Sequence, residues 1–269
     1  LVTGVQTCAL PIYITEAQAE KLIKLYTKAE KEILAEVNKA LLKGNSTYQL
    51  KAMLKNVRKI RKDLLGGAKD WSDQAVQQAY DAGMKSTGLG GGAGFNAVHQ
   101  QAVKVLAENA YGRFEIVDQV IGRRVNDVYR SIALENVTGQ VVGYQTWQQT
   151  AKRIRADMAD RGITGFVDAA GKRWNMETYA EMISRTTPRQ AMIEGTKNRL
   201  LEHDHDLAEI IGGIGKNTCD ICRAWNGRIV SLTGKTSGYP TLDEARDAGV
   251  FHPMCSHNIA TAMSFEDKK

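Results

Sequence analysis

The residues best suited to chemistry lie in two short clusters near the end of the chain. Cys219 and Cys222 are separated by two residues in CDICRAWNG, and after 29 intervening residues FHPMCSHN supplies His252, Cys255 and His257. Two thiolates at this spacing can bind one side of a tetrahedral ion, and a second cluster of cysteine and histidine completes four ligands. The pattern therefore predicts a Zn²⁺ site in which the three cysteines are ligands.

Either histidine of the second cluster can be the fourth ligand. His257 is the preferred candidate because Pro253 stiffens the turn beside His252. A site closed by four protein ligands is structural, and it stabilises domains whose strands are short. The alternative interpretation has no metal and consists of three buried cysteines beside a surface histidine.

The same clusters lack features that three classes of enzyme require. A zinc deaminase needs His-x-Glu, and no histidine of the chain is followed two residues later by glutamate. A zinc-framed nuclease could use His252 or His257 as a base, but if one binds the metal only the other remains, and FHPMCSHN contains no carboxylate to orient it. A thiol oxidoreductase needs a βαβ context, whereas Trp225-Asn226-Gly227 turns directly into a strand. We therefore expect a protein that is not an enzyme, with a nuclease kept as an alternative.

The elements that carry these clusters follow from the spacing of apolar residues. A three- and four-residue periodicity predicts long helices in the first part of the chain, at about 15–43, 47–65, 72–85, 95–134 and 146–161. Gly44 and Gly66-Gly67 are predicted to end the first two. GLGGGAG at 88–94 has five glycines in seven residues and is predicted to be a flexible joint.

The last third of the chain mixes short strands, turns and helices. GFVDAAGKRW predicts a small hairpin, DLAEIIGG and NGRIVSLTG predict strands, and helices are expected from Met176, from Thr187-Pro188 and from Leu242. We therefore expect an α+β fold. It consists of a long, mostly helical part at 13–175, a small α+β C-terminal domain at 176–265 and a tail at 266–269.

A local excess of positive charge marks the second predicted helix. The chain carries a net charge of +6, and Lys51, Lys55, Arg58 and Lys62 recur at i, i+4, i+7 and i+11, on one helical face. Such a stripe suits the phosphates of a nucleic acid or an acidic protein surface. A solvated helix face is the alternative, because no aromatic residue interleaves with the basic ones to stack on bases.

Residues 1–12 are set apart from the rest of the chain. They contain no Lys or Arg, so they lack the basic region of a secretory signal. From Val2 to Ile12 they resemble the translation of a common short-read sequencing adapter, and we expect them to be a non-native artefact. Cys8 is therefore no ligand candidate. No run approaches the ~20 apolar residues of a spanning helix, so we expect no membrane partner.

Four motifs in order carry a family resemblance: RTTPRQAMIEGTKNR, CDICRAWNGRIVSL, YPTLDEARDAG and HPMCSHNI. Together they closely resemble the C-terminal region of tailed-phage minor capsid proteins of the minor capsid protein 2 type, relatives of phage head-morphogenesis proteins. The resemblance is continuous over about 179–259 and looser over the upstream helices. It departs from the family pattern at Met254 and Ser256, where a polar residue and an arginine are expected.

The resemblance implies a structural component of the phage head, made in the host cytoplasm and placed near the portal. It implies a role in head assembly or DNA delivery, with portal or capsid proteins as partners and non-specific contact with DNA. A phage-encoded enzyme domain is the alternative, since Arg185 with Thr186 could correspond to the arginine that opens an ADP-ribosyltransferase fold. However, no Ser-Thr-Ser strand and no Glu-x-Glu follows them.

Overall fold

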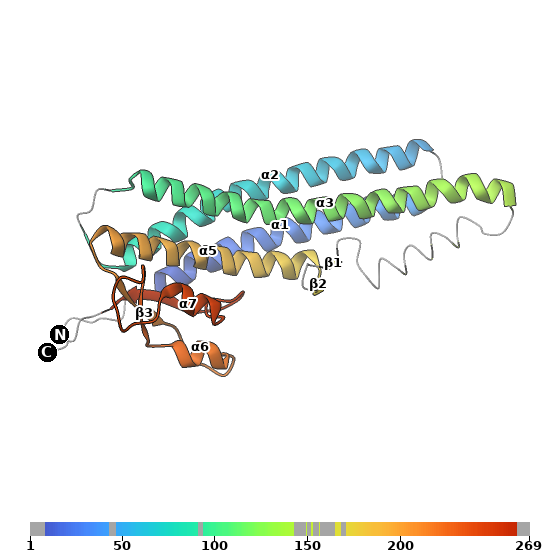
Figure 1. The fold of residues 1–269 in the computed structure, drawn as a ribbon. Helices are drawn as coiled ribbons and strands as arrows, with labels where there is room; N and C mark the ends of the chain where they lie inside the picture. Colours follow the sequence, from blue (N-terminus) through green and yellow to red (C-terminus); the bar gives the residue numbers. More distant parts are fainter. Residues whose placement is uncertain are drawn as a thin grey trace. The chain divides into compact units, whose positions relative to one another are not determined.

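The structure is a computed structural model that describes residues 9–42, 47–90, 94–142, 149, 152, 156, 165–167 and 171–262. Four long helices account for most of it: α1 (Ala9–Leu42), α2 (Thr47–Ser86), α3 (Ala97–Val142) and α5 (Met176–Glu202) (Figure 1). Two short helices, α6 (Asp220–Trp225) and α7 (Leu242–Asp247), lie near the C-terminus. The strands are short: β1 (Phe166–Val167), β2 (Arg173–Trp174), β3 (Leu207–Ile211), β4 (Ile229–Ser231) and β5 (Asn258–Thr261). The expected α+β class, with long helices first and a small strand-containing region last, is confirmed.

The described residues form two compact units, each built from separate stretches of the chain. One, which we call the sheet unit, lies within 1–20, 71–110 and 182–269, and the other, the helical unit, lies within 21–70 and 111–181. The predicted domains are continuous in sequence instead, and that division stays a prediction. The tail, most of residues 1–12 and most of the expected helix over 146–161 lie outside the described residues. Among the described helices, none combines the length and apolar character needed to cross a bilayer.

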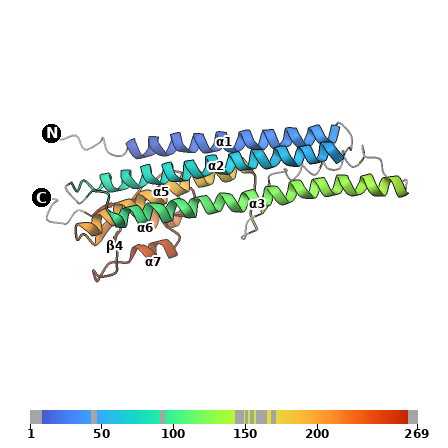
Figure 2. The ribbon, with the colours of Figure 1, turned by 90° about the horizontal axis from the view of Figure 1, so that it is seen from above.

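The helical unit is held by side chains that α1, α2 and α3 turn toward one another. In it α1 and α2 run side by side and antiparallel (Figure 2). The rings of Tyr26 and Phe114 pack with centroids 5.5 Å apart. The Arg61 guanidinium donates two hydrogen bonds to the Asp118 carboxylate, at 2.7 Å and 2.6 Å, so this inward-facing pair satisfies its own charges.

The prediction that the second helix ends at Gly66-Gly67 is wrong, because α2 continues through both glycines to Ser86. A Cβ atom on Gly67 would lie 2.8 Å from Cδ2 of Leu25 on α1, so the glycine gives room for that side chain. Leu64 and Ala68 are buried on either side. Burial of this face therefore outweighs the cost of about 1 kcal/mol that each glycine imposes on a helix.

Two other helix boundaries differ from the predicted ones. The first helix begins at Ala9 rather than Thr15, and Pro11 lies in its first turn, where backbone N–H groups have no partner within the helix. The two helices expected from Met176 and Pro188 form one helix, α5, with Pro188 in its interior. Ile183 and Ala191 are fully buried on either side of this proline. Packing therefore keeps the helix continuous despite the lost hydrogen bond.

In the sheet unit β3 is the central strand of an antiparallel sheet with the order β4-β3-β5. Ala208 pairs with Val230 of β4, and Ile210 pairs with Ile259 of β5. These four side chains are buried in one core with Ile193 and Leu200 of α5, Leu242 of α7, Cys222 and Cys255. Figure 1 shows this small sheet and α7 beside α5. The two cysteines are thus part of the hydrophobic core that joins the sheet to α5.

Within the sheet unit, the backbones of α2 and α5 touch where two glycines face them. A Cβ atom on Gly83 would lie 2.1 Å from the carbonyl oxygen of Met192, and one on Gly195 would lie 2.1 Å from that of Tyr80. The Thr196 hydroxyl donates a hydrogen bond of 3.0 Å to the Gly83 carbonyl across this contact. Only glycine at both positions allows the two helices to approach so closely.

A single carboxylate organises the loop that follows β4. Asp206 accepts hydrogen bonds from the hydroxyls of Ser231 (2.6 Å), Thr233 (2.6 Å) and Thr236 (2.7 Å), and from two backbone N–H groups. Burial alone would raise the pKa of Asp206, but these hydrogen bonds favour the ionised form and hold the pKa well below its ordinary value. The charged carboxylate therefore ties the loop to the start of β3.

We expect Gly195→Ala to lower the free energy of unfolding by about 3 kcal/mol, because its methyl group would collide with a backbone carbonyl. Gly66→Ala is the matched control: Gly66 also lies inside a long helix, but nothing is within 4 Å of the added Cβ. The control should stabilise the protein by up to about 1 kcal/mol. Thermal unfolding followed by circular dichroism measures both, and equal stability of the two variants would contradict the close contact.

We expect Asp206→Asn to lower the free energy of unfolding by about 2 kcal/mol at pH 7, because an amide cannot accept this set of hydrogen bonds. The carboxylate has a lowered pKa in the folded protein, so its contribution is complete above the unfolded pKa of about 4 and is lost as the pH falls toward the folded value. Urea denaturation from pH 3 to pH 7 should show the difference between variant and wild type shrinking below about pH 4. A difference that stays constant over this range would contradict the role of the charge.

Candidate metal centre

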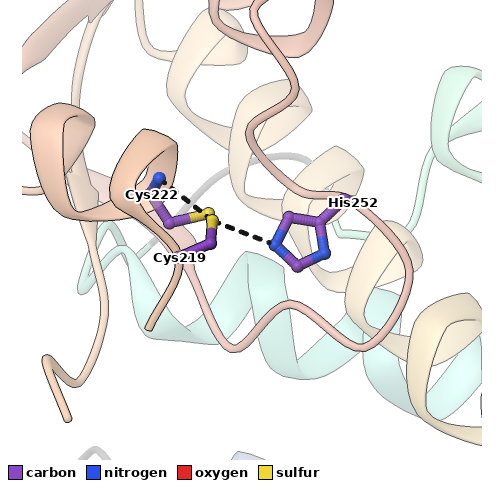
Figure 3. A group of neighbouring side chains, drawn as sticks. All are labelled: Cys219, Cys222 and His252. Atoms are coloured by element: carbon purple, nitrogen blue, oxygen red, sulfur yellow. Dashed lines mark hydrogen bonds between the residues drawn. The ribbon is translucent and has the colours of Figure 1, made fainter. Parts of the chain in front are cut away.

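Local backbone geometry presents the two cysteines of the first cluster. Cys219 is the N-cap residue of α6, and its Sγ accepts a hydrogen bond of 3.4 Å from the backbone N–H of Cys222. This places the side chain of Cys222 one turn further along, inside the core. Figure 3 shows both cysteines beside the ring of His252, which reaches them from the loop between α7 and β5.

The second cluster lies in that loop. The backbone N–H of Cys255 donates to the His252 carbonyl at 2.9 Å, and Met254 between them has a positive φ of 66°. The N–H of His257 in turn donates to Cys255 Sγ at 3.4 Å. Each cluster therefore contains one cysteine sulfur that accepts a backbone N–H, a contact that stabilises a thiolate.

The five donors form two groups that share Cys222. Cys219, Cys222 and His252 make one group and Cys222, Cys255 and His257 the other, with the ligand atoms of each group within 4.8 Å of one another. Neighbouring donors are 3.4 Å apart for Cys219 Sγ and His252 Nε2, 3.5 Å for Cys222 Sγ and Cys255 Sγ, and 3.6 Å for Cys255 Sγ and His257 Nδ1. Tetrahedral zinc with ordinary bond lengths places adjacent ligand atoms roughly 3.6 to 3.8 Å apart. These three pairs therefore have nearly the spacing of adjacent ligands, although the five donors form two groups of three and not one group of four.

His252 is oriented by its neighbour. Its Nδ1 lies 2.8 Å from the carbonyl oxygen of Pro253, which can only accept a hydrogen bond. Nδ1 therefore carries the proton, and the lone pair of Nε2 faces Cys219. Backbone carbonyls orient many metal-binding histidines in this way, so Pro253 supports His252 as a donor instead of disfavouring it.

His257 is buried, with an exposed fraction of 1%, and it packs against Gly212, where a Cβ atom would lie 2.6 Å from the ring. Its Nε2 is also buried and has no hydrogen-bond partner among the described residues. Burial, together with the positive charge of Arg189, lowers the pKa of His257, so the ring is neutral, the form that binds metals. The structure thus brings both histidines to the cluster, and the preference for His257 stays a prediction.

The two cysteines of the first cluster have opposite electrostatic environments. Hydrogen bonds from Cys222, first of all from its backbone N–H, lower the pKa of Cys219 to about 7. Burial raises the pKa of Cys222 to about 12. A divalent cation would supply the positive charge that a buried Cys222 thiolate requires at neutral pH.

The chemistry of the donors restricts the kind of ion. Three sulfurs and two imidazole nitrogens suit zinc or another soft transition metal, whereas Ca²⁺ and Mg²⁺ require oxygen ligands. Neither group of donors contains a carboxylate. The cluster could therefore hold a metal ion in a site made of protein ligands alone.

Side chains of α5 support the second cluster, a role that the sequence did not predict for them. The Arg189 guanidinium donates to the Ser256 carbonyl, and the Thr186 hydroxyl accepts a hydrogen bond of 3.3 Å from the Met254 N–H. Both residues belong to the motif RTTPRQ, which the family resemblance had already singled out in the sequence. The spacing of residues within this motif does not show which loop they contact.

The four basic residues of the predicted stripe lie elsewhere, on α2 in the helical unit. Lys51, Lys55, Arg58 and Lys62 are all exposed there. They share one face, as the spacing predicts, and take no part in the metal centre.

A comparison with protein families now adds to the geometry. Residues 11–264 match the model of the family described as phage minor capsid protein 2. No curated protein matches the chain, and no solved structure does. The matched range includes both Cys/His clusters and every described strand.

We expect the purified protein to carry about one Zn²⁺ per chain, as a closed tetrahedral site requires. Cys222→Ser should release the ion, because Cys222 belongs to both groups of donors. Cys8→Ser is the matched control and should leave the metal content unchanged. Elemental analysis of protein prepared without chelator gives the occupancy, and an occupancy below about one half in the wild type would favour the alternative of buried thiols without metal.

Comparison of His252→Ala with His257→Ala identifies the fourth ligand. Loading with Co²⁺ provides the readout, because its absorption reports tetrahedral geometry and thiolate ligation. The histidine whose replacement abolishes the tetrahedral spectrum is the fourth ligand. If both variants keep the tetrahedral spectrum, neither histidine is required.

Proposed function

The chain belongs to the phage minor capsid protein 2 family, and from this premise we propose that it is a structural protein of the virion, placed near the portal of a tailed-phage head. It assists head assembly or DNA delivery and is made in the cytoplasm of the bacterial host. The observation that carries the proposal is the family match over residues 11–264. The architecture is consistent with this role, since long helices suit a protein that bridges other proteins.

In this role the Cys/His cluster holds a structural Zn²⁺ ion. The three strands of the sheet contain only three to five residues each, so their hydrogen bonds provide limited stability. An ion bound by Cys219, Cys222 and the second cluster would link α6 directly to the loop before β5. Metal binding of this kind contributes free energy to folding, and it compensates for a small core.

The proposed role is structural and involves no catalysis. A metal closed by four protein ligands has no free position for substrate, and the two groups of donors contain no carboxylate that could serve as a base. Arg185 and Thr186, which suggested ADP-ribosyl transfer, lie inside α5, and the Thr186 hydroxyl is used to hold the Met254 N–H. Thr186 is therefore better explained as a support of the metal centre.

Assembly of heads with and without portal protein tests the proposal. We expect an epitope-tagged chain, co-expressed with the capsid and portal genes of its own phage, to co-purify with heads that contain portal and to be absent from heads assembled without it. Mass spectrometry of purified heads measures this, and few copies per head are expected. Equal amounts in both kinds of head would contradict a position near the portal, and absence from both would contradict a structural role in the head.

A further inference from the structure

One face of α2 carries a row of positive charge that the described residues do not neutralise. We call Lys51, Lys55, Arg58 and Lys62 the basic face. None of the four has an ion-pair partner among the residues that the structure describes. Basic residues beside them do: Lys59 pairs with Asp63 at 3.9 Å and Arg61 with Asp118 at 2.6 Å. The pairing of these neighbours leaves the basic face as the part of the helix available to an external anion.

The opposite side of α2 fixes the direction of this face. Leu50, Met53, Val57 and Leu64 are almost completely buried in the helical unit. Because these residues anchor the helix, the four basic side chains are held toward solvent on a rigid element. At a rise of about 1.5 Å per residue, the row is roughly 16 Å long. A DNA duplex presents a phosphate charge about every 1.7 Å along its axis, so each cation can find a phosphate along such a row.

An exposed aromatic ring lies at one end of the row. Tyr48 is three residues before Lys51, so it shares the same face, and 82% of its surface is exposed. The sequence analysis considered only aromatic residues between the basic ones and therefore missed it. Its hydroxyl can donate to a phosphate oxygen, and its ring can stack on an unpaired base.

The composition of the basic face favours a nucleic acid over a protein partner. Protein interfaces have a core of apolar side chains from which lysine is depleted. Here three of the four side chains are lysines, and the row contains no apolar residue. Lysines bind phosphate as point charges and read no base sequence.

We propose that the basic face binds the phosphate backbone of DNA without sequence preference. The proposal deepens the function proposed above by naming DNA as a direct partner. It rests on that function in one respect: the phage head would be the place where the protein meets DNA. Binding itself is a property of the purified chain. Absence of DNA binding would therefore leave the head assignment intact, and absence of the chain from heads would leave the binding result intact.

The test compares two variants of equal net charge. One replaces the basic face with glutamine: Lys51→Gln, Lys55→Gln, Arg58→Gln and Lys62→Gln. The matched control replaces four exposed lysines that have acidic partners on their own helices: Lys28→Gln, Lys39→Gln, Lys85→Gln and Lys104→Gln. Fluorescence anisotropy with a labelled 30-base-pair duplex measures affinity from 50 to 200 mM salt, and circular dichroism checks that both variants keep their helices.

We expect the wild type and the control variant to show a log–log salt slope of about −3.6, equivalent to a roughly 100-fold loss of affinity over this range. The basic-face variant should lose most of its affinity and have a slope near zero. Equal losses in the two variants would overturn the proposal, because net charge and not the face would then govern binding. Absence of duplex binding by the wild type would overturn it as well, and portal protein that co-purifies with the wild type but not with the basic-face variant would then identify an acidic protein partner.

Tyr48→Ala tests whether the basic face also binds single-stranded DNA, in addition to duplex DNA. If the ring stacks on bases, the change should weaken binding to a single strand of the same length by roughly 10-fold and leave duplex affinity nearly unchanged. That result would mean that the basic face binds single-stranded DNA as well as duplex DNA. Unchanged affinity for both would exclude Tyr48 from the site and leave the four cations as its only members.

Discussion

The contact between the backbones of α2 and α5 leaves no room for a side chain on Gly83 or Gly195. Because a carbonyl oxygen of each helix faces a glycine of the other, the two helices cannot slide without a clash or a gap. This contact holds α5, whose residues Ile193 and Leu200 form a core with the sheet. Arg189 on the same helix holds the loop that carries the second Cys/His cluster. The metal centre therefore depends on a crossing of helices that contains none of its ligands.

Burial disfavours the thiolate form of Cys222 in the cluster, and a bound metal ion would offset this cost. Cys222 and Cys255 belong to the hydrophobic core, and burial strongly favours the neutral thiol of Cys222. A bound cation would stabilise the thiolate and occupy the space toward which these donors point. The same ion would link α6 to the loop before β5, which explains how so short a sheet can be stable.

The two features of functional interest lie in different units and depend on opposite conditions, burial in one and exposure in the other. The Cys/His cluster of the sheet unit depends on burial and short distances, which suit the stabilising role proposed for it. The basic face of the helical unit depends on exposure and on charges that have no ion-pair partner among the described residues, which suit the DNA contact proposed for it. The chain belongs to the phage minor capsid protein 2 family, and both proposed roles are compatible with a structural phage protein.

The sequence by itself determined the features that depend on neighbours along the chain. The spacing of Cys219 and Cys222, and of Cys255 and His257, identified the donors because chelation by nearby residues is a local property. The periodicity of Lys51 to Lys62 likewise placed four cations on one face. Only the tertiary structure decided the features that depend on contacts between segments far apart in the sequence. It carried α2 through Gly67 because Leu25 packs there, kept α5 continuous through Pro188 because both flanking turns are buried, and brought each histidine to a different cysteine. Such outcomes depend on burial and close approach between residues far apart in sequence, and no local pattern encodes them.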